Sequence, residues 1–254
     1  MLNISRRCPI VDTCHPGVLP AEIVNAKQPV VLKGLVNHWP MVQLGQQNPA
    51  LVADYLNSHY NGQPTQVYYG EPGLNGRYFY DDSDSKLNYQ TRMGRVDEVL
   101  QQILAWQDQT QPPSVYIASN LLQSHFPTLP DQHNMQLPKP ELGYATEPDR
   151  VSIWLGNRSL AACHYDTSEN VACCVLGKRR FTLFPPEQIA NLYPGPLEPT
   201  PGGQVISMVD FERPDLQRFP TFPQAIAAAK IAELESGDAL YLPSMWWHQV
   251  EALS

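Results

Sequence analysis

The sequence predicts a mainly β fold, an antiparallel barrel or jelly roll that follows a mixed α/β segment. From about residue 112 onward the chain is a series of short apolar stretches, each closed by Pro, Gly or Asp. No helix of the size that links parallel strands separates these stretches, which favours antiparallel pairing. Proline occurs 25 times in 254 residues, about twice its usual frequency, and this disfavours long helices.

The N-terminal segment, residues 1–110, is expected to be an α/β elaboration of that fold. The stretch PVVLKGL (29–35) is short and β-branched, which predicts a strand closed by the turn HWP. NPALVADYLNSHY (48–60) predicts a helix, and residues 94–109 give the clearest one. Its apolar residues follow helical spacing, with two acidic residues in the first turn: Val96, Val99, Leu100, Ile103 and Leu104, after Asp97 and Glu98.

The C-terminal segment, residues 111–254, is expected to supply the β core. Its predicted strands lie at 114–119, 150–156, 170–177, 179–186, 237–243 and 246–253. Residues 219–235 predict a short helix inside a long crossing loop. Cys173 and Cys174 would point to opposite faces of their strand, and small core residues are a better interpretation of them than metal ligands.

Composition limits the classes of function. The chain is 43% hydrophobic and 17% charged, as expected for one globular domain over residues 1–254, a better interpretation than two small domains. The net charge of −8 argues against general nucleic-acid binding. No apolar run has the length of a membrane span, and the N-terminal residues lack the apolar stretch expected of a signal peptide. Five cysteines without C-x-x-C spacing favour a reduced, cytoplasmic protein.

One histidine–aspartate pair stands out in the strand-like stretch ACHYDTSEN (162–170). Residues two apart on a strand share a face, so His164 and Asp166 would converge. One such pair is about what chance supplies with seven histidines and 25 acidic residues. A further histidine, His248, lies on the last predicted strand, and two histidines with one carboxylate form the facial triad of iron sites. The alternative is that His164 and Asp166 form a hydrogen-bonded pair and that His248 is a core histidine.

The order of motifs along the C-terminal half favours the iron site over the hydrogen-bonded pair. HYDTSENVACCVLGKRRFTLFPPEQIANLYPGP (164–196), VDFERPDLQRFPTF (209–222) and GDALYLPSMWWHQVEAL (237–253) follow one another. This arrangement resembles the JmjC, or cupin-like, Fe(II)- and 2-oxoglutarate-dependent oxygenases, and among them the asparaginyl hydroxylases. The resemblance covers most of residues 110–254 and, more loosely, PVVLKGLVNHWP and YFYDD in the N-terminal part.

The resemblance implies a double-stranded β-helix, the jelly roll of cupin and JmjC proteins, with a catalytic iron at its mouth. It implies that His164, Asp166 and His248 hold Fe(II), and that 2-oxoglutarate and O₂ are cosubstrates. Arg179 stands at the position that binds the far carboxylate of 2-oxoglutarate, and strand parity places it with Phe181, whereas Lys178 falls on the other face. Two further residues match cosubstrate-side positions of the family: Tyr116 and Asn170.

The chain departs from the family pattern in three places. Arg179 replaces a lysine, and arginine can also bind a carboxylate through two hydrogen bonds. Ala161 replaces a threonine that helps to hold 2-oxoglutarate. The sequence stops at Ser254, before the last core strand and the C-terminal helices of relatives, which often form dimers. These departures bear on activity and on a possible homodimer.

The expected activity is hydroxylation of a protein side chain or another macromolecular substrate. The resemblance implies that oxidative decarboxylation of 2-oxoglutarate drives it. Asp166 favours hydroxylation over halogenation, because related halogenases lack that carboxylate. Histone demethylation is the least favoured activity, since no reader domain or basic tail is visible. Two other classes stay open: a metal-binding cupin that does not use 2-oxoglutarate, and a non-catalytic binding module. Membrane and nucleic-acid partners are not expected.

Overall fold

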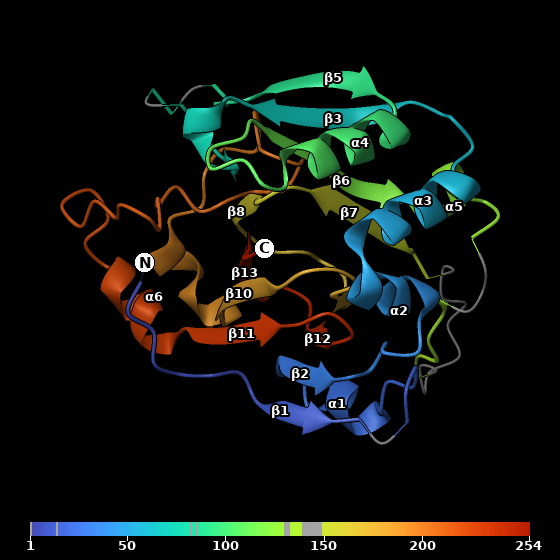
Figure 1. Cartoon of the computed structure of the whole chain (residues 1–254). Coiled ribbons are helices and arrows are strands. Elements are labelled where there is room, and N and C mark those ends of the chain that lie inside the picture. The colour runs from blue at the N-terminus through green and yellow to red at the C-terminus, as the bar shows by residue number, and fades with distance from the viewer. Residues whose placement is uncertain (1, 14, 82, 85, 130–132, 139–148) are drawn as a thin grey trace.

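The computed structural model of the whole chain describes residues 2–13, 15–81, 83–84, 86–129, 133–138 and 149–254. Strands that are distant in sequence lie side by side in three sheets (Figure 1). Sheet A has five strands in this spatial order: β11 (Lys230–Leu234), β10 (Arg179–Phe184), β13 (Trp247–Ala252), β8 (Leu160–His164) and β4 (Arg77–Tyr78). Sheet B has four: β1 (Ile10–Asp12), β2 (Val30–Lys33), β12 (Ala239–Leu242) and β9 (Asn170–Cys173). Sheet C has four: β5 (Gln90–Gly94), β3 (Thr65–Gly70), β6 (Ser114–Leu121) and β7 (Ser152–Gly156).

Sheets A and B form the jelly roll that the sequence predicts. Along the chain β8 lies in sheet A, β9 in sheet B, β10 and β11 in sheet A, β12 in sheet B and β13 in sheet A. Apolar side chains from both sheets meet in one buried cluster that includes Phe181, Leu183, Leu240 and Leu242. Each such side chain stabilises the fold by about 1.5–3 kcal/mol when fully buried. The mainly β fold class is therefore confirmed.

The helices predicted at 48–60 and 94–109 pack on one face of sheet C. Along the chain the helices are α1 (Ala21–Asn25), α2 (Pro40–Gln47), α3 (Pro49–His59), α4 (Val96–Trp106), α5 (Leu122–His125) and α6 (Phe222–Ala228), with 3₁₀ turns at Pro72–Leu74 and Pro186–Leu192. Helix α1 packs with sheet B, and α6 packs beside Phe184 of β10. Helix α3 begins where the Asn48 side chain accepts a hydrogen bond from the Ala50 amide. Val96, Val99 and Leu100 of α4 are buried against sheet C, as their spacing predicts. Within the described residues, no helix combines the length and apolar character needed to span a membrane.

Two parts of the fold differ from the sequence prediction. Residues 112–253 were expected to form two facing sheets, but β6 and β7 pair with the N-terminal strand β3 and with each other in the third sheet. The predicted loop with a short helix at 219–235 contains α6 and also the strand β11. The alanine-rich sequence of that stretch favours a helix, and only pairing with β10 makes its second half a strand.

The cysteine pair at the end of β9 behaves as predicted. Cys173 packs against the cluster around Val30 and Tyr241, whereas Cys174 packs in the cluster around Phe181, so the two side chains lie on opposite sides of the strand. Neither belongs to the one group of potential metal ligands found among the described residues.

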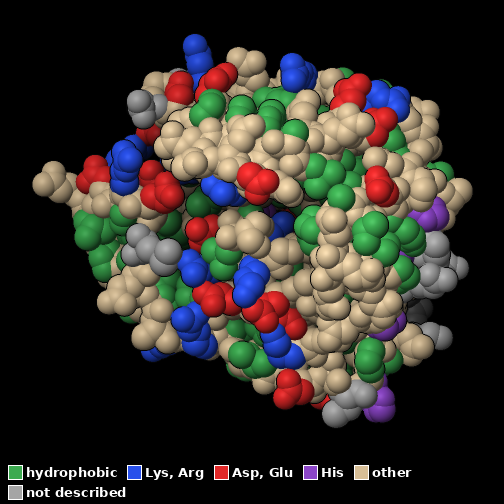
Figure 2. Space-filling view, viewed as in Figure 1, with side chains coloured by type: hydrophobic (Ala, Val, Ile, Leu, Met, Phe, Trp, Pro, Cys, Tyr) green, Lys and Arg blue, Asp and Glu red, His purple; other side chains and the backbone are tan. Residues whose placement is uncertain are grey.

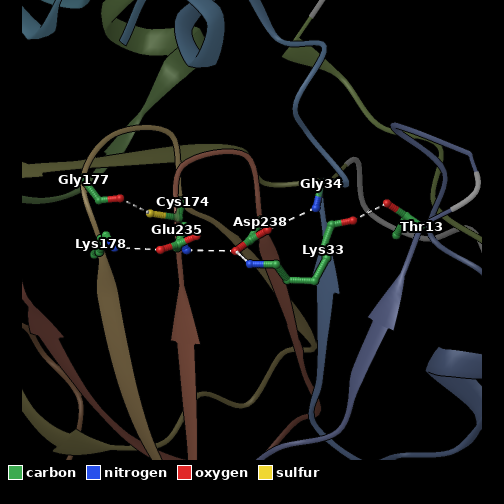
Figure 3. A network of polar contacts seen from close by, with 8 residues as sticks. All are labelled: Thr13, Lys33, Gly34, Cys174, Gly177, Lys178, Glu235 and Asp238. Atoms are coloured by element: carbon green, nitrogen blue, oxygen red, sulfur yellow. Dashed lines mark hydrogen bonds and ion pairs between the residues drawn. The ribbon is translucent and has the colours of Figure 1, made fainter. Parts of the chain in front are cut away.

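A buried carboxylate ties the N-terminal strand β2 to the jelly roll (Figure 3). Asp238, just before β12, is 4% exposed. Its carboxylate accepts hydrogen bonds from the Gly34 and Glu235 amides at 3.1 and 2.9 Å, and Lys33 Nζ forms an ion pair with it. The turn that leads to it needs Gly237, because φ is +97° there and a Cβ atom would lie 1.7 Å from Asn37 Oδ1. Sequence-distant strands are thus joined by charge as well as by backbone pairing.

Candidate metal centre

Strand pairing brings the two histidines together. In the antiparallel pair of β8 and β13, His164 lies directly opposite His248. Their ring centroids are 4.3 Å apart. Asp166 follows β8 by two residues, and potential ligand atoms of the three side chains all lie within 4.8 Å of one another. The structure therefore brings together the three residues that the sequence singled out.

Two hydrogen bonds fix the loop that carries Asp166 against the turn before β13. The Met245 amide donates to the carbonyl oxygen of Asp166 at 2.8 Å, and Ser244 Oγ donates to the carbonyl oxygen of Thr167 at 2.7 Å. Met245 adopts a φ of +66°, an uncommon conformation for a non-glycine residue. The backbone thus holds the aspartate in place before any ligand binds.

The ring nitrogens of both histidines are assigned by their backbone partners. His164 Nδ1 lies 2.7 Å from the carbonyl oxygen of Ala162, and His248 Nδ1 lies 3.0 Å from that of Trp246. A carbonyl oxygen only accepts hydrogen bonds, so each Nδ1 carries a proton, and in a neutral ring Nε2 then presents the lone pair. This arrangement is typical of histidines that bind a metal through Nε2.

The electrostatics of the centre favour a cation. His248 is 5% exposed, and burial together with the nearby His164 ring lowers the pKa of His248 to about 3. Its Nε2 lies 3.7 Å from Asp166 Oδ2, but a neutral imidazole does not form an ion pair with that carboxylate. An imidazole lone pair therefore faces an anionic oxygen with no proton to share, an arrangement that a bound cation would stabilise.

Two amide side chains orient the Asp166 carboxylate. Asn170 Nδ2 donates to Oδ2 at 2.8 Å, and Gln204 Nε2 donates to Oδ1 at 3.4 Å. Asn170 was expected beside the cosubstrate, and the structure places its amide on the aspartate. Gln204 was not identified from the sequence, because it lies in a proline- and glycine-rich loop without periodic pattern. That loop reaches the site because Ile206, two residues after Gln204, forms an isolated β-bridge with His164 of β8.

The three consecutive basic residues at the start of β10 have different surroundings. Lys178 Nζ pairs with Glu235 at 2.6 Å on the surface, and Arg180 pairs with Glu233 and Glu251 at 3.0 and 3.4 Å. Arg179 has no ion pair with a carboxylate side chain of the described residues. Its Nη1 donates to the carbonyl oxygens of Lys178 and Ser254.

Register places Arg179 on the same face of sheet A as the metal centre. Directly opposite residues of neighbouring strands point to one face. Leu183 is opposite His248, and Arg179 lies four residues before Leu183, so all three share that face. This agrees with the parity predicted from the sequence.

Tyr116 approaches from sheet C. Burial raises the pKa of the Tyr116 phenol, and the Arg179 cation acts in the opposite direction, so the two groups lie near each other. The Tyr116 ring stacks on Tyr78, with centroids 5.6 Å apart. Figure 2 shows a hollow in this face of the molecule, with histidine and Lys or Arg side chains visible at its bottom.

The two tryptophans before His248 are core residues. Trp246 packs in the cluster between sheets A and B, with Lys230 Nζ 5.4 Å from its ring centroid. Trp247 is 1% exposed and packs on Tyr165, with centroids 4.8 Å apart. Both therefore support the strand that carries His248.

Comparison with known proteins identifies relatives of most of the chain. Residues 16–254 match the profile of the family described as cupin-like domain. The chain is 28% identical over 247 residues to HSPB1-associated protein 1 of Rattus norvegicus, covering 91% of this chain and 47% of that protein. It is 29% identical over 103 residues to lysine-specific demethylase JMJ31 of Arabidopsis thaliana, covering 40% and 18% of the two chains. It is 35% identical over 105 residues to JmjC domain-containing protein D of Dictyostelium discoideum, covering 41% and 22%. The chain thus spans about half the length of the rat protein and less of the other two.

Proposed function

Because the chain belongs to the cupin-like domain family, which includes 2-oxoglutarate-dependent oxygenases, we propose that it is an Fe(II)- and 2-oxoglutarate-dependent oxygenase. The observation that carries this proposal is the convergence of two imidazoles and one carboxylate, with one potential ligand atom of each within 4.8 Å of the others. Two histidines and one carboxylate with open positions are the ligand set of non-haem Fe(II) oxygenases.

His164, Asp166 and His248 would hold the iron. Their donor atoms are nitrogen and oxygen, which suit Fe(II), and their orientations are fixed by backbone carbonyls and amide side chains. When bound, the iron would activate O₂, with 2-oxoglutarate as the reductant. The protein's part is to keep the buried His248 imidazole neutral, to orient the carboxylate and to leave open positions.

Arg179 would bind the far carboxylate of 2-oxoglutarate. Its guanidinium lies on the inner face of sheet A and has no carboxylate side chain as partner among the described residues, whereas both basic neighbours do. The Tyr116 hydroxyl would donate to the same carboxylate from sheet C. Asn170 would act on the metal through Asp166, because its amide already binds that carboxylate at 2.8 Å.

The proposed reaction is insertion of one oxygen atom into a C–H bond of a protein side chain. The name of one relative, HSPB1-associated protein 1, supports a protein partner, and that of another, lysine-specific demethylase JMJ31, supports a macromolecular substrate. Hydroxylation of an N-methyl group leads to loss of the methyl carbon. Side-chain hydroxylation and demethylation therefore give products of different mass. A hydroxylated peptide gains one oxygen atom, whereas a demethylated peptide loses one CH₂.

Turnover of 2-oxoglutarate tests the proposal. Purified protein with Fe(II), ascorbate, O₂ and 2-oxoglutarate should form succinate, and candidate peptides should increase the rate. Asp166→Ala should abolish succinate formation, whereas Lys178→Ala, a surface variant of the same region, should retain it. A metal-loaded, folded protein that binds no 2-oxoglutarate would instead indicate a cupin with other chemistry. Binding of 2-oxoglutarate without succinate under any substrate would indicate a non-catalytic module.

A further inference from the structure

We propose that the hydroxyls of Tyr78 and Ser114 donate hydrogen bonds to the cosubstrate carboxylate that Arg179 binds, which makes both of them cosubstrate-binding residues. This inference rests on the proposed function. Tyr78 begins the stretch YFYDD and Ser114 begins a predicted strand, and neither was assigned a role at the site from the sequence. Tyr78 comes from the edge of sheet A and Ser114 from sheet C, and the two sheets face each other across the hollow.

Register places Tyr78 on the face of sheet A that carries the site. In the parallel pair of β4 and β8, Tyr78 lies beside Ala161, and Ala161 is opposite Val250 of β13. Val250 is opposite Phe181 of β10, two residues from Arg179. Tyr78 of β4 and Arg179 of β10 therefore point to the same side of sheet A, and the strands β8 and β13 lie between them. At about 4.8 Å per strand, β4 and β10 are about 14 Å apart, so long side chains from the two strands leave room for a carboxylate between them.

Sheet C supplies the opposite wall. Tyr116 is opposite Tyr68 of β3, and Ser114 is opposite Gly70, so Ser114 and Tyr116 share one face of their strand. The Tyr116 ring stacks on Tyr78 at an interplanar angle of 24°. Ser114 Oγ points toward the space that a side chain at Gly70 would fill. Ser114 and the Tyr78 ring thus both neighbour Tyr116, whose phenol feels the Arg179 cation.

Both hydroxyls are buried and unsatisfied among the described residues. Tyr78 is 5% and Ser114 3% exposed, and within the described residues neither oxygen has a hydrogen-bond partner. Buried polar groups are nearly always hydrogen-bonded, so two adjacent exceptions indicate a missing ligand. The Ser114 hydroxyl is close enough to act on the Tyr78 phenol as a hydrogen-bonding neighbour and lowers its pKa, although the two oxygens do not reach full hydrogen-bond geometry. Burial has the larger effect and raises that pKa to about 12, so at neutral pH the phenol is a donor.

Tyr80 provides a matched control. It is 2% exposed, and its hydroxyl donates to the carbonyl oxygen of Pro199 at 2.8 Å. Tyr80→Phe removes a satisfied hydrogen bond, whereas Tyr78→Phe removes an unsatisfied hydroxyl and keeps the stacked ring. The two substitutions therefore have opposite expected effects on stability and on cosubstrate affinity.

The test is calorimetric titration of 2-oxoglutarate into Mn(II)-loaded wild type, Tyr78→Phe, Ser114→Ala and Tyr80→Phe, together with thermal unfolding without cosubstrate. Tyr78→Phe should weaken 2-oxoglutarate binding about 10-fold or more, since hydrogen bonds to charged groups are strong, without lowering the unfolding temperature. Ser114→Ala should act in the same direction. Tyr80→Phe should lower the unfolding temperature and leave the affinity within about twofold. 2-Oxobutyrate, which lacks the far carboxylate, should bind wild type and Tyr78→Phe equally.

The outcomes separate this inference from the proposed function. Wild-type protein that binds Mn(II) but no 2-oxoglutarate would overturn both. Wild-type affinity in Tyr78→Phe would overturn the inference and leave the proposed function intact. A loss of affinity accompanied by a lower unfolding temperature, or an equal loss for 2-oxobutyrate, would assign Tyr78 a structural role and would also overturn it.

Discussion

Removal of the Arg179 guanidinium should separate the cosubstrate site from the surface charges around it. Arg179→Ala is the perturbation, and Lys178→Ala is its control because the two residues are neighbours on the same strand. Register directs Arg179 to the face of sheet A that carries His248, whereas Lys178 pairs with Glu235 on the outside. The variants therefore lose the same charge from opposite sides of one strand.

The expected magnitudes follow from these surroundings. Lys178 and Glu235 have side chains that are 58% and 59% exposed, and exposed charge pairs contribute about 0–1 kcal/mol. Lys178→Ala should thus change 2-oxoglutarate affinity by a few-fold at most. Arg179 would form a partly buried pair with the ligand carboxylate, and loss of one partner of such a pair costs about 3–5 kcal/mol. At 1.4 kcal/mol per factor of ten, the affinity should fall roughly 100-fold or more.

The assay is titration of 2-oxoglutarate into each variant with Mn(II) in place of the redox-active iron. Arg179→Lys should give an intermediate affinity, because lysine keeps the charge but not the two parallel hydrogen bonds of the guanidinium. Equal affinities of Arg179→Ala and Lys178→Ala would refute the reasoning and would remove Arg179 from the site.

Three further perturbations have defined outcomes. Asp238→Asn should lower the free energy of unfolding by about 2–3 kcal/mol in urea titrations, because it leaves Lys33 without its buried partner; an unchanged unfolding midpoint would contradict this. Burial raises the pKa of the Cys173 thiol to about 12, so at pH 8 this thiol stays protonated, and alkylation should be far slower in native than in urea-unfolded protein; equal rates would show that it is accessible. Asn170→Ala should weaken metal binding about 10-fold or more and Gln204→Ala by less, because their hydrogen bonds to the Asp166 carboxylate are 2.8 and 3.4 Å long. The reverse order in metal titrations would show that the loop with Gln204 controls the centre.

The parts of the fold that the sequence predicts are those with local patterns. The apolar spacing of α4 identifies a helix whose buried residues are those at the predicted positions. The short strands β6, β7, β9, β10, β12 and β13 are recognisable from β-branched residues and from the turns between them. The parity argument for Arg179 needs only the alternation of side chains along one strand, and the register of β10 agrees with it.

The parts that the sequence does not predict depend on partners far away in the chain. Residues 230–234 have no strand pattern of their own and become β11 by pairing with β10. The third sheet forms because β3 offers a free edge to β6, a choice that no local signal records. Gln204 and Tyr78 reach the site only through pairing with β8. Tyr78 belongs to β4, which pairs with β8, and Gln204 lies beside Ile206, which forms a bridge with β8.

Metal titration tests the central claim most directly, namely that His164, Asp166 and His248 hold one metal ion. Mn(II) added to metal-free protein should bind with a stoichiometry of one. Binding should be lost in His164→Ala and His248→Ala, while both variants keep the circular dichroism spectrum of a folded β protein. Undiminished one-to-one binding in either folded variant would contradict the claim and would place the metal, and with it the proposed chemistry, elsewhere.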